Sequence, residues 1–77
     1  MAVEIMTRVD ARGLSCPMPI VRTAQAAKTT PSGAFIEVLA TDPGSTKDLA
    51  AWAKATGHAL VEQSVDGGVY RFLIRRK

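Results

Sequence analysis

The sequence predicts a fold of the α/β (α+β) class, a two-layer α/β sandwich in which two helices cover one face of a mixed four-stranded sheet. The spacing of apolar residues alternates between the periods of strands and helices in the order β-α-β-α-β-β. Each β-α-β crossover joins parallel strands by a right-handed connection, whereas a hairpin makes the last strand antiparallel. The chain has 77 residues, which is the length of one small domain, expected to span residues 1–77.

The first strand and the first helix are separated by a loop that contains a glycine. Residues 3–9 (VEIMTRV) alternate in polarity, which predicts a strand with one buried face. After the loop of residues 10–15 we expect a helix that is capped by Cys16 and ends by Thr30, because Pro31 disfavours α geometry in the residue before it. Residues spaced three or four apart define the amphipathic pattern of this helix: Ile20, Val21, Ala24, Ala27 and Lys28.

The second strand and the second helix show the same change of period. Residues 35–40 (FIEVLA) are apolar on both faces except for Glu37, which predicts a central strand. Ser45, with Asp48 three residues later, resembles a capping box at the start of the helix, and Gly57 suits its C-terminal end. One face of this helix is expected to carry Leu49, Trp52, Ala53 and Thr56.

The last two strands are predicted to form a hairpin. Residues 59–65 and 69–74 have the composition of strands, and the Asp-Gly-Gly sequence of residues 66–68 is a typical hairpin turn. Residues 75–77 (RRK) form a short basic tail.

Composition and charge exclude several classes of protein. Hydrophobic residues make up 47% of the chain, which favours a folded domain over a disordered one. One cysteine excludes an internal disulfide and a CxxC redox pair, and one cysteine with one histidine is too few for a structural zinc site. No apolar run approaches the ~18 residues of a membrane helix, so a cytoplasmic location is expected. The net charge of +3 suits an acidic protein partner or weak contact with nucleic acid.

Three loops are expected to meet at one edge of the sheet. Residues 10–16, residues 41–45 and the hairpin of residues 66–68 all follow the carboxyl ends of strands that the topology makes parallel. Functional groups of open α/β sheets gather at this edge. If the first two strands are neighbours, Cys16 and Asp42 lie along the same rim.

Cys16 is the candidate reactive residue of this rim. At the N-cap position it is followed by Pro17 and, two residues later, by Pro19, neither of which has an N–H group. The N–H of Met18 is then the remaining usual donor to the sulfur. The prolines stiffen the loop, which lowers the entropy lost when the thiol docks to a partner.

The electrostatic setting of Cys16 favours a thiolate. The positive end of the helix dipole stabilises an anion, and Arg12 and Arg22 are expected to add to the positive field. Such settings lower the pKa of a cysteine from about 8.5, and we expect this for Cys16. The simpler alternative, a lone cysteine buried as a small hydrophobic residue, is the commoner case in general, but it does not explain the prolines or the position at the end of a strand.

Four blocks of sequence carry a resemblance to a known family. They are the lead-in DARGL of residues 10–14, the motif CPMP of residues 16–19, ATDPGS of residues 40–45, and GGVYRF of residues 67–72. In the order and spacing of these blocks the chain resembles the TusA (SirA-like) family of small sulfur-carrier proteins over nearly its whole length. The Cys-Pro-x-Pro motif is the core of this resemblance.

The resemblance implies a persulfide relay. Cys16 would accept sulfane sulfur from a cysteine desulfurase or a rhodanese-type donor and pass it to an acceptor protein thiol, in tRNA thiolation, molybdenum-cofactor biosynthesis or sulfur oxidation. The sheet order would be 1-2-4-3. Met18 stands where relatives often have an acidic residue, which points to a different partner preference. The remaining site residues divide into those that shape the site, Pro17, Pro19, Asp42 and Arg12, and those that contact partners, Met18 and Arg22.

Other interpretations of the same residues stay open. A non-catalytic regulatory or nucleic-acid-binding module would use the basic residues, but aromatic residues are 5% of the chain and the arginines are scattered. Asp42 could simply form an Asx turn before Pro43, and Arg22 could be a solvated helix charge. We expect no cofactor and no metal, a persulfide carrier rather than a stand-alone turnover enzyme, no membrane and no direct nucleic-acid contact, and a monomer.

Overall fold

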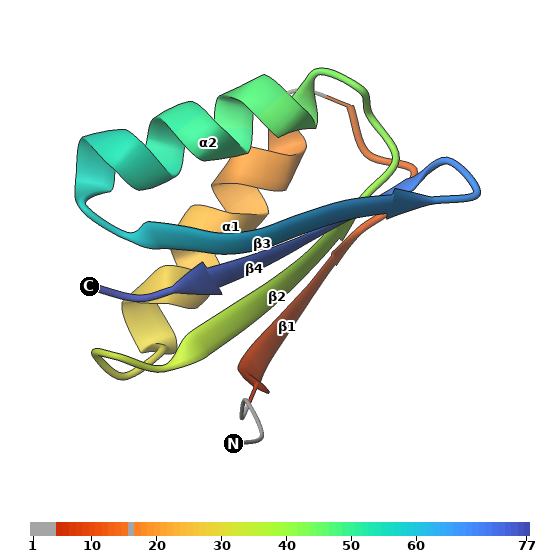
Figure 1. The fold of residues 1–77 in the computed structure, drawn as a ribbon. Coiled ribbons are helices and arrows are strands. Elements are labelled where there is room, and N and C mark those ends of the chain that lie inside the picture. The colour runs from red at the N-terminus through yellow and green to blue at the C-terminus, as the bar shows by residue number, and fades with distance from the viewer. Residues whose placement is uncertain (1–4, 16) are drawn as a thin grey trace.

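The computed structural model describes residues 5–15 and 17–77 of the chain, and it has the predicted architecture. The elements are β1 (Ile5–Ala11), α1 (Met18–Thr29), β2 (Phe35–Ala40), α2 (Ser45–Thr56), β3 (Ala59–Asp66) and β4 (Val69–Arg75). The sheet has the order β1-β2-β4-β3, with β1 parallel to β2 and β4 antiparallel to both of its neighbours. Both helices lie on the same face of this sheet (Figure 1). The predicted fold class, topology and strand order are therefore confirmed.

Strand ends differ from the prediction because pairing extends the strands. β1 continues through Asp10 and Ala11, which were expected in the loop, since these residues pair with Leu39 and Ala40 of β2. Ala11 is fully buried, so its position is fixed by the sheet and the core rather than by the nearby glycine. The first two residues of the predicted strand lie outside the described residues.

The hairpin between β3 and β4 has a two-residue turn. Gly67 and Gly68 both have positive φ, at 58° and 81°. This conformation belongs to the type I′ turn that matches the twist of the flanking strands, and glycine adopts it without steric cost. The predicted turn is thus confirmed, although both strands extend one residue further than expected.

Helix α1 buries only part of the face that its apolar residues indicated: Ala27 is buried and Ile20 packs against the core. Its buried residues are Pro19, Thr23 and Ala27, spaced four apart, whereas Val21 is 38% exposed. A threonine is tolerated on this face because its hydroxyl donates a hydrogen bond of 2.7 Å to the carbonyl oxygen of Pro19, one turn earlier. The backbone supplies the acceptor, and the pattern of apolar side chains alone does not reveal it.

Helix α2 begins without the predicted capping box. Gly44 is the N-cap residue and makes no side-chain cap, while Ser45 is buried and donates from its hydroxyl to the carbonyl oxygen of Asp42 at 2.6 Å. The predicted end is confirmed, with Gly57 at φ 82°. Of the residues expected on one face, Leu49 and Ala53 are buried, whereas Thr56 is exposed at the end of the helix. The buried residues of α2 are Ser45, Leu49 and Ala53.

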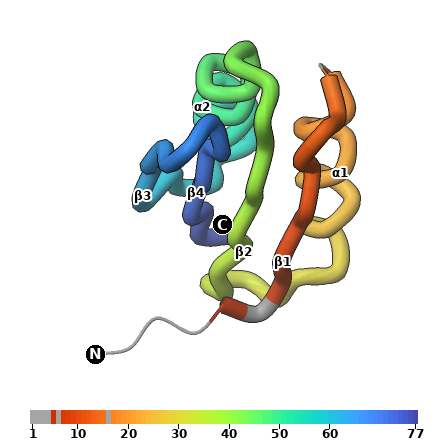
Figure 2. Tube along the Cα trace, turned by 90° about the vertical axis from the view of Figure 1, so that its right-hand side faces the viewer, coloured from red at the N-terminus to blue at the C-terminus, as the bar shows by residue number. Residues whose placement is uncertain are grey.

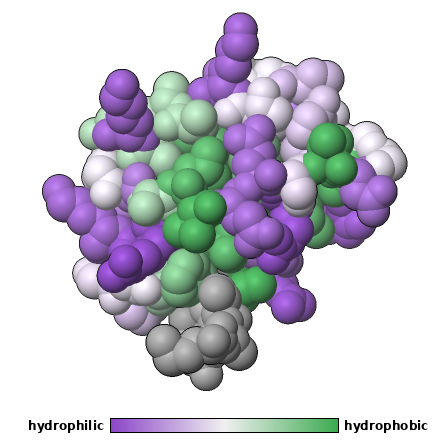
Figure 3. Space-filling view, in the orientation of Figure 1, coloured by the Kyte–Doolittle hydropathy of each residue, from purple (hydrophilic) through white to green (hydrophobic). Residues whose placement is uncertain are grey.

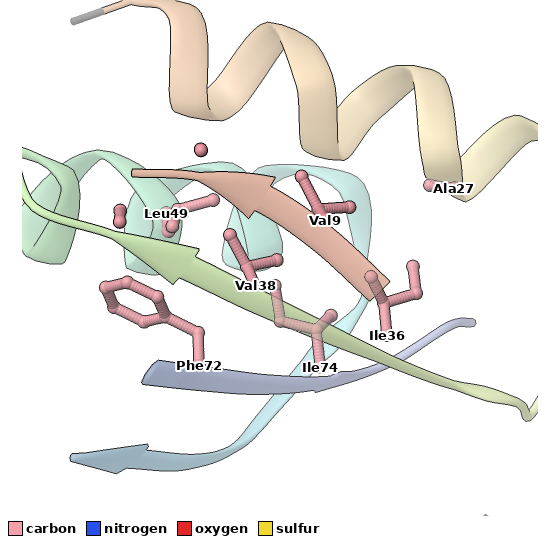
Figure 4. Packing of buried hydrophobic residues seen from close by; sticks show 9 residues of the cluster. Val9, Ala27, Ile36, Val38, Leu49, Phe72 and Ile74 are labelled. Carbon is pink, nitrogen blue, oxygen red and sulfur yellow. The ribbon is translucent and has the colours of Figure 1, made fainter. Parts of the chain in front are cut away.

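The core lies between the helices and one face of the sheet (Figure 4). Alternate residues of β2 point into it, which leaves Glu37 on the open face between two arginines. Arg71 Nε lies 2.7 Å from Glu37 Oε2, and Arg8 Nε lies 3.6 Å from Oε1. The predicted central position of β2, with its one charged residue, is confirmed. The buried cluster comprises Val9, Ala11, Ala27, Ile36, Val38, Ala40, Leu49, Phe72 and Ile74.

The edge strand β3 carries exposed apolar side chains, which matter for the expectation that the protein is a monomer. Val61 and Val65 on this strand are 52% and 61% exposed. On the face seen in Figure 3, apolar side chains gather in a band that polar side chains border on both sides. The monomer stays a prediction. In the described part of the chain, neither helix has the length and apolar character needed to cross a membrane.

His58 joins the end of α2 to the C-terminal segment, and this contact depends on pH. Its Nδ1 accepts the backbone N–H of Lys77 at 2.9 Å, and its ring lies 5.0 Å from that of Trp52, centroid to centroid. Burial, followed by the charges of Arg76 and Lys77, lowers the pKa of His58 below 6.5. Neutral His58 is therefore favoured in the folded state, and the stability it contributes is present above pH 6.5 and is lost as pH falls through the lower folded pKa.

We expect the fluorescence of Trp52, the one tryptophan of the chain, to fall on acidification with a midpoint below pH 6.5. A protonated imidazole withdraws electron density from an excited indole beside it and quenches its emission. The His58→Gln variant should lack this transition. A midpoint at or above pH 6.5 in the native protein would contradict the assignment.

Candidate functional site

The loops that follow the strands meet at one end of the sheet, as the topology predicted (Figure 1). The N–H of Gly13, in the loop after β1, donates a hydrogen bond of 2.9 Å to the Thr41 hydroxyl in the turn after β2. The N–H of Leu14 donates to the carbonyl oxygen of Ala11 at 3.2 Å. These bonds hold the loop against the neighbouring turn. Thr41 was not singled out from the sequence, because only the fold brings it opposite Gly13.

Cys16 lies outside the described residues, but the structure describes the residues on both sides of it. Ser15 and Pro17 are exposed, and the N–H of Met18 donates to the carbonyl oxygen of Ser15 at 2.9 Å. One expectation is corrected by this geometry: Pro17 is the N-cap residue of α1 in place of Cys16. The expected contact between the N–H of Met18 and the sulfur of Cys16 lies outside the described residues and stays a prediction.

The two prolines of the motif have different roles. Pro17 is exposed at the N-cap, whereas Pro19 is one of the fully buried side chains of the molecule. Pro19 also accepts the hydroxyl of Thr23 at its carbonyl oxygen. The motif is therefore anchored in the core at its last residue, while Pro17 and Met18 stay at the surface.

Arg12 is already matched by an acidic neighbour. Its Nε and Nη2 each lie 2.8 Å from an oxygen of Asp10, and its backbone N–H also donates to Asp10 Oδ1 at 3.2 Å. The expectation that Arg12 adds a free positive field at the rim is corrected accordingly. The side-chain hydrogen bond from Arg12 is the main cause that lowers the pKa of Asp10 from 3.8 to about 2.

Replacing Arg12 by glutamine is expected to return the pKa of Asp10 toward 3.8, because its strongest hydrogen-bond donor and the facing charge are lost together. A carboxyl with a lowered folded pKa stabilises the fold above its unfolded pKa, so this stability is present above pH 3.8 and disappears as pH falls toward 2. An NMR titration of the Asp10 side chain measures the shift, and an unchanged midpoint in Arg12→Gln would contradict the pairing.

Asp42 shapes the turn after β2. Its Oδ1 accepts the N–H of Gly44 at 3.3 Å, and its carbonyl oxygen accepts both the N–H and the hydroxyl of Ser45. This is the Asx-turn arrangement considered from the sequence. Its role in sulfur transfer stays a prediction.

Met18 and Arg22 share one exposed side of α1. Both are exposed, and their spacing of four residues places them one turn apart on the helix surface. They follow directly after the motif, so a protein that docks at the rim also meets this part of the helix. Among the described residues, no group of three His, Asp or Glu side chains is arranged to hold a metal ion.

Comparisons with known proteins agree with this fold. A sequence model of the family described as "Sulfurtransferase TusA" matches residues 7–76. The sulfur carrier protein TusA of Allochromatium vinosum is 47% identical over 68 residues, which cover 88% of this chain and 90% of that protein. The TusA sulfur carrier of Pseudomonas putida is 35% identical over 69 residues, 90% of this chain and 86% of that protein. A solved structure of a SirA-like protein from Desulfitobacterium hafniense superposes with a TM-score of 0.81 at 28% identity, covering 91% of this chain and 96% of that one.

Proposed function

Since this chain belongs to the TusA family of sulfur carriers, we propose that it carries sulfane sulfur as a persulfide on Cys16. A sulfur carrier implies one protein that supplies the sulfur and one that receives it. We propose a cysteine desulfurase or a rhodanese as donor, and an acceptor thiol in tRNA thiolation, molybdenum-cofactor synthesis or sulfur oxidation in the cytoplasm.

The transfer needs two thiol exchanges and no external oxidant. The Cys16 thiolate attacks the outer sulfur of a donor persulfide, R–S–SH; a new S–S bond forms at Cys16 and the donor leaves as R–S⁻. An acceptor thiolate then attacks the outer sulfur of Cys16–S–SH and takes it, which regenerates the Cys16 thiolate. Both steps require an accessible thiolate.

The observation that carries the proposal is that the residues on both sides of Cys16 are exposed and are followed by a buried anchor. Ser15 and Pro17 are exposed on either side of Cys16, and the buried Pro19 fixes the segment to the helix. The bond from Gly13 to Thr41 supports the loop from the other side. Flanking residues that are exposed and anchored in this way suit a thiol that must enter the active sites of two different proteins in turn.

Incubation with a cysteine desulfurase and cysteine, or with a rhodanese and thiosulfate, tests the proposal. Intact-mass measurement should show the addition of one sulfur atom, about 32 Da, removable by a thiol reductant. Peptide mapping should place it on Cys16. Absence of the adduct with both donors, while another carrier loads in parallel, would overturn the proposed function.

A further inference from the structure

A groove runs between the free edge of β1 and helix α1. It has a volume of about 380 Å³ and is lined by Thr7, Arg8, Val9 and Asp10 of β1 together with four residues of α1. In Figure 2, β1 and α1 lie side by side, with β1 outermost in the sheet. β1 pairs only with β2 among the described strands, so its other edge faces this groove. The α1 residues in the lining are Arg22, Gln25, Ala26 and Thr29.

The backbone of β1 forms the floor of the groove. Successive side chains of a strand point to opposite faces of the sheet, so four consecutive residues can line one groove only along the edge of the strand, through their main chain. Residues 7–11 keep a regular register with β2, and the irregularity of β1 lies before them, between Ile5 and Thr7. A regular edge strand presents N–H and C=O groups that another extended chain can pair with.

The wall formed by α1 has the spacing of one helix face. Positions 22, 25, 26 and 29 have the i, i+3, i+4, i+7 spacing of one helix face, which aligns them beside the strand. A chain added to β1 would place every second side chain against this wall. Arg22 and Gln25 are exposed there and offer hydrogen-bond donors.

The charges beside the groove favour an acidic occupant. Asp10 is matched by Arg12, so the carboxylate in the lining is already paired. Arg22 adds a positive charge from α1, and the side chain of Arg8 is 76% exposed although it lies 3.6 Å from Glu37. The net field at the groove is therefore positive, and a carboxylate in the docked chain would find a partner at Arg22.

We propose that the free edge of β1 is a docking site for an extended, acidic segment of the sulfur-donor protein, which adds to the sheet as a fifth strand with its side chains against α1. This inference rests on the proposed function. The loop that carries Cys16 continues directly from β1, so a chain bound along this edge is aligned with the rim where the sulfur is transferred. Main-chain pairing gives affinity, and the wall of α1 gives selectivity.

Two loading reactions separate docking from chemistry. The donor enzyme is either a desulfurase with cysteine or a rhodanese with thiosulfate, whichever loads the native protein faster. Loading from this enzyme requires docking in the groove, whereas loading from glutathione persulfide, a small molecule, does not. For Arg22→Glu and Gln25→Trp, the ratio of the enzyme-donor rate constant to the glutathione-persulfide rate constant should fall about tenfold, through lost charge pairing and a blocked groove. Lys47→Glu makes the same charge change on the exposed surface of α2 and should keep the native ratio.

Amide hydrogen exchange tests the strand pairing itself. Binding of the donor enzyme should slow exchange within residues 7–10 by about tenfold or more, since edge amides become hydrogen-bonded. Unchanged rate-constant ratios in both variants, or amide protection confined to the helices, would overturn the docking inference. Loading of Cys16 in the same experiments would leave the proposed function intact. A stable dimer of the free protein, broken by Gln25→Trp, would assign the edge to a second copy instead and also overturn it. Failure of the native protein to load from any donor would overturn both proposals.

Discussion

Replacing Cys16 by serine is expected to abolish sulfur loading from every donor. A hydroxyl at this position has too high a pKa to ionise near neutrality, and an oxygen does not enter the thiol exchange that moves sulfane sulfur. The chain has no second cysteine to take its place. The expected result in the intact-mass assay is the complete loss of the adduct of about 32 Da.

Ser15→Ala is the matched control for this experiment. Its side chain is exposed and adjacent, while the backbone carbonyl that accepts from Met18 is kept. Ser15→Ala should load within about twofold of the native rate, since surface substitutions away from special contacts change little. A sulfur adduct on Cys16→Ser, or equal loss in both variants, would contradict the assignment of the sulfur to Cys16.

Replacing Phe72 by alanine is expected to remove a large part of the stability of the fold. Phe72 is fully buried on β4 and packs in the cluster between the sheet and the helices. Truncation of a buried phenylalanine costs about 3–5 kcal/mol, from lost burial and the cavity left behind. Domains have roughly 0.05–0.15 kcal/mol of stability per residue, or about 4–12 kcal/mol for a chain of this length.

Denaturant unfolding followed by circular dichroism measures the loss. Phe72→Ala should show a much lower midpoint or be partly unfolded in buffer, whereas Val65→Ala, a truncation at a residue that is 61% exposed on β3, should change stability by less than about 0.5 kcal/mol. Similar midpoints for the two variants would show that the core is not centred on Phe72.

Much of the fold follows from residues close together in the sequence. The glycine pair that ends β3 fixes its hairpin, Gly57 ends α2, and the apolar strand with a single Glu37 occupies the centre of the sheet. Errors occurred where backbone hydrogen bonds decide and the pattern of apolar residues does not show them. β1 extends to Ala11 because β2 pairs with it, and α1 buries Thr23 because a backbone oxygen one turn earlier satisfies the hydroxyl.

The candidate site divides in the same way. The Cys-Pro-Met-Pro motif and its turn residues stand next to one another in the chain, so the sequence identifies them. The pairing of Arg12 with Asp10 changes the charge at the rim, and side-chain geometry rather than residue type establishes it. Thr41 supports the loop from 28 residues away, and no local pattern indicates that contact.

By itself the sequence determined the order of strands and helices, the positions of the turns and the candidate sulfur-bearing residue, because backbone propensities and reactive side chains act over a few neighbouring residues. Only the tertiary structure decided which residues of α1 face the core, that the Thr41 hydroxyl supports the loop before the motif, and that the edge of β1 is open beside α1. These properties depend on segments that the fold brings together from far apart in the chain, and their energies arise from contacts that do not exist until it has formed.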